Sequence, residues 1–150
     1  MRTFFEKELA ARGVARSVYP PGTYGAGPLD DQRFYKPKDC TPSEGVAVDG
    51  TVTWLNGRAR YVYVLEEDTG SPTVPPNLDL PAGTRWRLDV PAAATPVSSG
   101  AVRYGQVPAG LTQRFPTEGA PAALVSGKKY YLYVLADIAL PNSRCLFTAR

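Results

Sequence analysis

The stretch TVTWLNGRARYVYVL, residues 51–65, decides the fold class, because two alternating segments flank a tight-turn signal. That signal, Asn56-Gly57, is the strongest short indication of a hairpin that a sequence offers. A two-residue type I′ turn there would place Trp54 opposite Ala59 and so fix the register of the pair. The sequence therefore predicts a hairpin, and its core-facing side carries Val52, Trp54, Ala59, Tyr61 and Tyr63.

Further segments have the pattern of strands. Residues 85–90 alternate cleanly, so that Trp86 and Leu88 share one side of a predicted strand. The loop at 66–83 is rich in proline and acidic residues and cannot be helical. Strands are also predicted at residues 101–107, 128–136 and 146–149. This spacing predicts one all-β domain over residues 43–150, an antiparallel β-sandwich of immunoglobulin or fibronectin type or a small barrel, with about six to eight strands.

One sequence pattern occurs twice. Tyr61-Val62-Tyr63-Val64-Leu65 returns as Tyr131-Leu132-Tyr133-Val134-Leu135. Central strands select aromatic and β-branched residues, so the repeat is explained if both copies are central strands. The alternative interpretation is that the two copies are pseudo-equivalent strands in facing sheets.

Two segments precede the predicted β-domain. Residues 1–16 predict a short helix, since Thr3 and Glu6 have the spacing of a capping box and Gly13 offers a stop. Residues 17–42 are rich in proline and aromatic residues, whereas a flexible linker would be rich in glycine and serine. They predict an extended arm that lies along a surface. Its aromatic side chains form the first part of a candidate interaction surface: Tyr19, Tyr24, Phe34 and Tyr35.

The two cysteines, Cys40 and Cys145, lie near the two ends of the predicted β-domain. A disulfide between them would close the domain and stabilise it by about 4–5 kcal/mol, if the loop-entropy account of crosslinks holds. Such a bond indicates an oxidising compartment, the periplasm or the cell surface. The alternative is a pair of unrelated buried thiols in a cytosolic protein.

The first residues do not have the pattern of a signal peptide, because Glu6, Lys7 and Glu8 stand where an apolar core would be needed. If the protein is exported, we expect the chain to be the processed form; if it is not, Met1 is native. The sequence also contains no stretch near the roughly 18 apolar residues of a membrane-spanning helix.

The chain contains no histidine, the residue used most often for acid–base catalysis near neutral pH. Serine–histidine triads, cysteine–histidine pairs and histidine-based metal sites are thereby excluded. The acidic group Glu66-Glu67-Asp68 follows a strand at a loop and predicts a solvated turn, with calcium binding and carboxylate catalysis as alternatives. We therefore expect no catalytic, cofactor-binding or metal-binding residues and no enzymatic activity.

Residues 102–131, VRYGQVPAGLTQRFPTEGAPAALVSGKKYY, contain a strand ending in Tyr-Gly, a Val-Pro-x-Gly step, a Gly-Ala-Pro step and a tyrosine-rich strand. This succession resembles a pattern of small uncharacterised exported proteins and lipoproteins of Gram-negative bacteria. The resemblance implies an extracytoplasmic β-domain without an assigned activity. The matching positions are Tyr104, Gly105, Pro108, Gly110, Gln113, Pro116, Gly119, Pro121, Leu124, Gly127 and Tyr130.

The segment at residues 105–127 is also a long excursion between two predicted strands. Its prolines stiffen the path, and Phe115 and Leu124 can pack on the core. It predicts a structured crossover between sheets; the alternative is a recognition loop that presents Gln113 and Arg114 on a rigid tip. These two residues complete the candidate interaction surface.

These patterns predict a non-enzymatic, extracytoplasmic β-domain that binds or supports a protein partner or its own subunits. One alternative is a structural component of a large assembly, such as a virion decoration or tail protein, that docks through its N-terminal arm. A weaker alternative is a carbohydrate-binding module that stacks sugars on Trp54, Trp86 and tyrosines, although both tryptophans alternate as core residues do. The net charge of +3 arises within residues 1–38 and is too dilute for a nucleic-acid partner.

Overall fold

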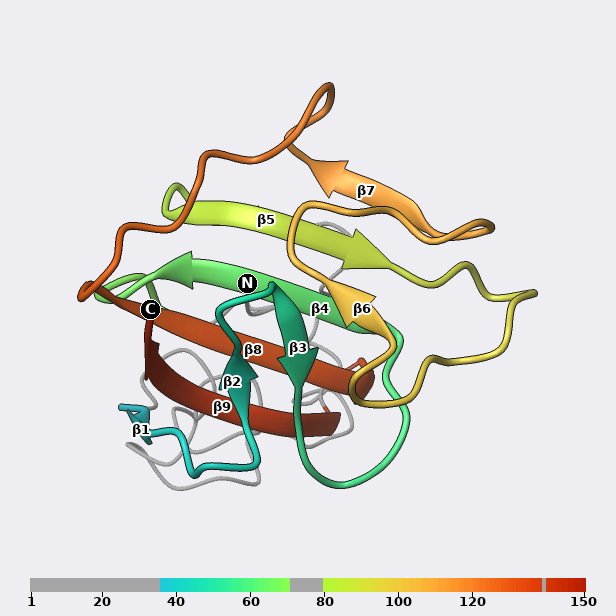
Figure 1. The fold of residues 1–150 in the computed structure, drawn as a ribbon. Coiled ribbons are helices and arrows are strands. Elements are labelled where there is room, and N and C mark those ends of the chain that lie inside the picture. Colours follow the sequence, from blue (N-terminus) through green and yellow to red (C-terminus); the bar gives the residue numbers. More distant parts are fainter. Residues whose placement is uncertain (1–35, 71–79, 139) are drawn as a thin grey trace, which may run out of the picture.

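The computed structural model describes residues 36–70, 80–138 and 140–150 (Figure 1). The predicted helix at 1–16 and most of the predicted arm at 17–42 lie outside the described residues. The same holds for four members of the candidate interaction surface: Tyr19, Tyr24, Phe34 and Tyr35.

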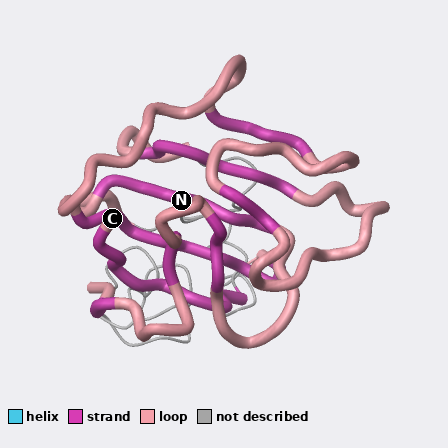
Figure 2. The backbone as a smooth tube through the Cα atoms, in the orientation of Figure 1, coloured by secondary structure: helices cyan, strands magenta, loops and turns pink. Residues whose placement is uncertain are grey.

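The described residues form two β-sheets. In chain order the strands are β1 (Lys38–Asp39), β2 (Gly45–Val46), β3 (Thr51–Thr53), β4 (Tyr61–Glu66), β5 (Thr84–Asp89), β6 (Val102–Arg103), β7 (Thr112–Phe115), β8 (Lys129–Asp137) and β9 (Leu140–Thr148). One sheet has the order β1-β9-β8-β4-β5-β7, and the other has the order β2-β3-β6. Figure 2 shows strands and loops, and no helix, over this part of the chain. The all-β prediction is confirmed there.

The small sheet lies across one face of the large sheet, and the main core fills the space between them (Figure 1). Val52 and Val102 come from the small sheet and pack with Val64, Trp86 and Leu132 of the large one. The described strands do not close on themselves, so the predicted barrel is wrong. We call this packed layer the inter-sheet core.

The expectation of a purely antiparallel arrangement is also wrong at one edge. β1 pairs with β9 in parallel, with Lys38 opposite Cys145, while the other described strand pairs are antiparallel. Parallel neighbours need a long connection between them, and these two strands lie near opposite ends of the described chain. The connection between β1 and β9 therefore includes almost the whole domain.

The predicted hairpin at Asn56-Gly57 is wrong, although its turn has the expected backbone. Both residues have positive φ, 66° and 98°, as a type I′ turn requires. The flanking strands nevertheless belong to different sheets: β3 pairs with β2 and β6, and β4 pairs with β5 and β8. The Trp54 amide donates to Ser99 Oγ at 2.8 Å and the Leu55 amide to Ser143 Oγ at 3.0 Å. The turn thus carries the chain from one layer to the other.

Because the chain changes layers at this turn, the prediction that the residues before and after it share one core-facing side is wrong. Val52, Trp54 and Ala59 lie in the inter-sheet core as expected. Tyr61 and Tyr63 instead belong to a second apolar cluster on the opposite face of the large sheet. The orientation of β4 is set by its neighbours β5 and β8 rather than by β3, which the local turn signal does not encode.

The two copies of the repeated pattern are neighbours in the large sheet. β4 pairs with β8 so that Tyr61 lies opposite Leu135, Tyr63 opposite Tyr133, and Leu65 opposite Tyr131. Both are central strands, which agrees with the first interpretation. The alternative of equivalent strands in facing sheets is wrong, because the copies form adjacent strands of one sheet.

The predicted strands at 85–90 and 128–136 are confirmed to within one residue at each end by β5 and β8. The strand expected at 101–107 is only the two residues of β6, and Gly105 turns soon afterwards with φ of 84°. The strand expected at 146–149 is much longer, because β9 begins at Leu140 and pairs along β8. Proline at position 141 concealed its start, and the ladder accommodates it at a register shift.

Cys40 and Cys145 form the predicted disulfide, with their Sγ atoms 2.05 Å apart and 105 positions between them in sequence. The Cys40 amide also donates to the Leu146 carbonyl at 2.7 Å. Cys145 is buried and belongs to the inter-sheet core, while Cys40 packs against it. The bond therefore ties the start of the described domain to its last strand.

Replacing both cysteines, in a Cys40→Ala/Cys145→Ala variant, should lower the free energy of unfolding by about 4–5 kcal/mol, because the unfolded chain regains the entropy of a long loop. Urea unfolding of the variant and the wild type measures the difference. Reduced wild-type protein is the matched control and should unfold like the variant. A variant within about 1 kcal/mol of the oxidised protein would contradict the assignment.

Candidate functional site

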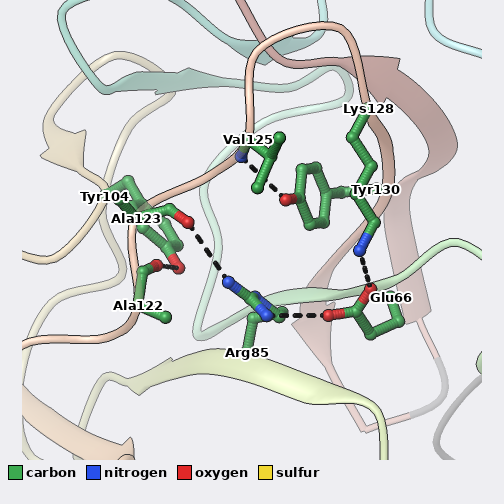
Figure 3. A network of polar contacts seen from close by, with 8 residues as sticks. All are labelled: Glu66, Arg85, Tyr104, Ala122, Ala123, Val125, Lys128 and Tyr130. Carbon is green, nitrogen blue, oxygen red and sulfur yellow. Dashed lines mark hydrogen bonds and ion pairs between the residues drawn. The ribbon is translucent and has the colours of Figure 1, made fainter.

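A polar network joins the segment between β7 and β8, which we call the crossover, to the ends of β4 and β5 (Figure 3). Glu66 is the last residue of β4 and lies opposite Tyr130 of β8. Lys128 directly precedes β8, and Tyr104 follows β6. We call the set the crossover network; its members are Glu66, Arg85, Tyr104, Lys128 and Tyr130.

A bulge in β5 brings Arg85 to this network. The register pairs Val64 with Trp86 but Leu65 with Thr84, so Arg85 is the additional residue of the ladder. Residues in bulges leave the strict alternation of side chains between the two faces of a sheet. The Arg85 guanidinium accordingly lies 5.6 Å from the centre of the Tyr130 ring, which belongs to the inter-sheet core.

Glu66 and the two cations bind the crossover to the sheet (Figure 3). The Glu66 carboxylate accepts from Arg85 Nη1 and from Lys128 Nζ, each at 2.9 Å. Arg85 Nη2 also donates to the Ala123 carbonyl at 3.2 Å, and Lys128 Nζ lies 5.2 Å from the Tyr130 ring centre. A cation over an aromatic face adds to the ion pairs.

Two tyrosines hold the same segment by their hydroxyl groups. Tyr104 donates to the Ala122 carbonyl at 2.8 Å, and the Val125 amide donates to the Tyr130 hydroxyl at 2.8 Å. The Tyr104 ring also packs edge-on against Trp86, with ring centres 5.3 Å apart. Over residues 122–128 the crossover is therefore bonded to side chains of the large sheet and to Tyr104, the residue that follows β6 of the small sheet.

Protonation of the network follows from these contacts. The hydrogen bond from Lys128, followed by that from Arg85, lowers the pKa of Glu66 below its usual 4.5. The same contact with Glu66 raises the pKa of Lys128. Burial raises the pKa of Tyr104. At neutral pH Glu66 is thus a carboxylate neutralised by two cations, and Tyr104 is a neutral hydrogen-bond donor.

The acidic group Glu66-Glu67-Asp68 does not act as a unit. Glu66 is occupied by its ion pairs, whereas Glu67 and Asp68 are exposed to solvent. Within residues 36–70, 80–138 and 140–150, the one cluster with metal-ligand atoms close together is Cys40, Glu44 and Cys145. Its sulfurs are bonded to each other, and Glu44 accepts hydrogen bonds from Thr41 and Ser143.

Gln113 on β7 connects the crossover to the core. Its Oε1 accepts from Trp86 Nε1 at 2.8 Å, and its Nε2 donates to the carbonyls of Pro116 and Gly119 at 2.9 and 2.8 Å. Every polar atom of the side chain thus has an intramolecular partner. The predicted part of Gln113 in an interaction surface stays a prediction, and the structure adds that this amide fixes the shape of the loop.

Arg114 and Phe115 are more accessible than Gln113. The side chain of Arg114 is 44% exposed and lies 3.6 Å from Asp89 Oδ2, and Phe115 is 37% exposed. Both belong to β7, which is at one end of the six-stranded order and has β5 as its described neighbour. This part of the molecule is therefore a fixed strand edge with a cation and an aromatic ring beside it.

Sequence reasoning identified Gln113 and Arg114 but not Glu66, Arg85 and Lys128 as a group. Their meeting depends on the bulge at Arg85 and on the pairing of β4 with β8, and neither is visible in local patterns. The one sequence feature that could have indicated this group is the presence of basic residues next to Trp86 and Tyr130.

Comparisons of the chain with protein-family models, with curated proteins and with solved structures found no match. The described residues include no helix that is long and apolar enough to cross a membrane.

Neutralising Glu66, in a Glu66→Gln variant, should lower the free energy of unfolding at pH 7 by about 0.5–1 kcal/mol, the range of partly exposed ion pairs. Because the folded-state pKa of Glu66 is lowered, its contribution is complete above about pH 4.5 and is lost as the pH falls through the folded pKa. Urea unfolding between pH 7 and pH 3 should show the two proteins converging in acid.

The matched control is Glu67→Gln, which removes the same charge from the next, exposed residue. We expect this control to unfold like the wild type at every pH. An equal loss in both variants, or a Glu66→Gln effect that does not shrink at all as the pH falls below 4.5, would contradict the assigned ion pairs.

Proposed function

We propose that the protein is a non-enzymatic, extracytoplasmic β-domain that acts through protein–protein contacts at β7 and the adjoining crossover. The observation that carries the proposal is a strand edge held in a fixed shape by Gln113 and the crossover network. A surface that is ordered before binding loses less entropy when a partner docks.

The chemistry of this surface supports a protein partner. Phe115 and Arg114 lie on β7, and aromatic residues and arginine are enriched in protein interfaces. Val107 and Val125, on the loops before and after β7, are 46% and 57% exposed. Among the described residues only β5 pairs with β7, and an extended segment of a partner can add to the free side of such a terminal strand as a further strand.

The disulfide supports an extracytoplasmic location. Bonds of this kind persist in oxidising surroundings such as the periplasm or the cell surface, and they are rare in the cytosol. We also infer that the two packed layers are a β-sandwich, while the immunoglobulin-like or fibronectin-like strand order stays a prediction.

The alternatives receive less support. The role as a component of a large assembly depends on the predicted arm, most of which lies outside the described residues, and stays a prediction. Carbohydrate binding through the tryptophans is disfavoured, because Trp54 and Trp86 are 3% and 0% exposed in the inter-sheet core. Their rings are not available for stacking on a sugar.

A photoreactive residue in place of Phe115 tests the proposal in cells that produce the protein naturally. Irradiation should give a discrete adduct with another polypeptide, which mass spectrometry identifies. The matched control carries the same residue in place of Val48, which is 79% exposed in the turn between β2 and β3. Adducts from both positions, or from neither, would contradict a specific surface at β7.

Two further variants distinguish direct contact of the partner with an exposed side chain from dependence on the fixed shape of the loop. An excess of purified wild-type protein should suppress the Phe115 adduct, and an Arg114→Glu protein should do so at least about tenfold less well. Gln113→Ala should also compete less well, since it frees the loop without altering an exposed side chain. Full competition by both variants would place the contact elsewhere.

A further inference from the structure

A carboxylate lies beside the two cysteines of the disulfide. Glu44 belongs to the turn between β1 and β2, where its amide donates to the Thr41 carbonyl at 3.0 Å. One ligand atom from each of Cys40, Glu44 and Cys145 lies within 4.8 Å of the other two. We call these three residues the Cys-Glu cluster. Two cysteine sulfurs and a carboxylate oxygen are a set of donors that zinc accepts.

Hydrogen bonds hold the Glu44 carboxylate in place. Its Oε1 accepts from the Thr41 amide at 3.0 Å and from Thr41 Oγ1 at 3.1 Å. Its Oε2 accepts from Ser143 Oγ at 2.6 Å, and the Leu55 amide donates to the same hydroxyl, whose proton is thus directed to Glu44. A carboxylate oxygen has two lone pairs, so Oε2 keeps one for a metal ion. Partners of this kind orient the ligands of metal sites and raise their affinity.

The cluster is open on one side. Cys145 is 4% exposed and belongs to the inter-sheet core, whereas Cys40 and Glu44 are partly exposed. An ion therefore reaches the sulfurs from the side of Cys40 and Glu44, and a water molecule can complete its coordination. Three protein ligands with one open position are an established form of zinc coordination.

Backbone pairing keeps the two cysteines together without the bond between their sulfurs. Cys40 directly follows β1, which pairs with β9 so that Asp39 lies opposite Leu146. The Cys40 amide donates to the Leu146 carbonyl at 2.7 Å. Zn–S bonds of about 2.3 Å at a tetrahedral ion place two sulfurs roughly 3.8 Å apart. Rotation of the two side chains is enough to reach that separation.

We propose that the protein with reduced cysteines binds one Zn²⁺ ion through Cys40, Cys145 and Glu44. The bonded sulfurs of the disulfide do not serve, because the ligand form of cysteine is the thiolate. In the reduced protein two Zn–S bonds and one Zn–O bond form, and both thiol protons pass to water. The chain is in this reduced state before its disulfide forms.

The inference is independent of the proposed function of β7, which lies at the opposite end of the strand order from β1. It goes against the sequence-based expectation that the chain has no metal-binding residues. The ion and the disulfide use the same two sulfurs, so the site exists in one redox state of the protein and is closed in the other.

Titration with Co²⁺ tests the site, because this ion takes the tetrahedral geometry of Zn²⁺ and absorbs light when thiolates bind it. A phosphine first reduces the disulfide to two thiols, consuming one water and leaving as the phosphine oxide, and is removed under argon. The full-length reduced protein should give a thiolate–cobalt absorption that saturates at one ion per chain, and Zn²⁺ should abolish it. The oxidised protein is the control and should give no such absorption.

Substitutions at position 44 test whether the carboxylate is a ligand. Glu44→Gln should weaken Co²⁺ binding by at least about tenfold. Glu44→His should bind at least as tightly as the wild type, because imidazole is itself a zinc ligand. Glu67→Gln, at an exposed residue outside the cluster, is the matched control and should titrate like the wild type. Near-ultraviolet circular dichroism of each sample reports whether the reduced chain is folded before and after addition of metal.

Four results would overturn the proposal. The first is the lack of a saturable cobalt absorption from the reduced wild type, including a reduced chain that is unfolded and that Co²⁺ does not refold. The second is equal affinity of the wild type and Glu44→Gln, which would assign the ion to the thiols alone. The third is failure of Glu44→His to bind. The fourth is equal binding by the oxidised protein, which would place the ion elsewhere.

Discussion

The pairing of β4 with β8 is the interaction on which the rest of the structure depends. Two strands of nearly the same composition lie side by side at the centre of the large sheet, with Tyr63 opposite Tyr133 and Val64 opposite Leu132. Their rings and aliphatic chains are buried on both faces. Cross-strand pairs of this kind stabilise a sheet directly, and burial of both faces adds the hydrophobic contribution of two cores.

The other features follow from this pair. Its inner side chains receive the small sheet and form the inter-sheet core, and its ladder with β5 contains the bulge that turns Arg85 toward Glu66. That ion pair, with Lys128, holds the crossover against the sheet. On its other side β8 pairs with β9, and the disulfide joins Cys145 of β9 to Cys40, the residue that follows β1.

The long central strands β4, β5 and β8, the core tryptophans and the disulfide could be predicted from the sequence, because alternation and cysteine placement are local or simple properties. The short strands β1, β2 and β7 and the start of β9 could not. Which strands pair with one another could not be predicted in this way. Asn56-Gly57 sets a backbone turn, but the hydrogen bonds to Ser99 and Ser143, remote in sequence, decide that the turn changes layers. The candidate site was predicted only at Gln113 and Arg114, since the meeting of Glu66 with Arg85 requires a register shift.

Native-state hydrogen exchange along β4 and β8 tests most directly the claim that this pair, buried on both faces, supports the fold. The amides of Tyr61–Glu66 and Lys129–Asp137 that bond across the ladder should exchange only through global unfolding, with the same free energy that urea unfolding reports. Exchange of these amides through local openings, at a lower free energy than amides of β3, would contradict the account.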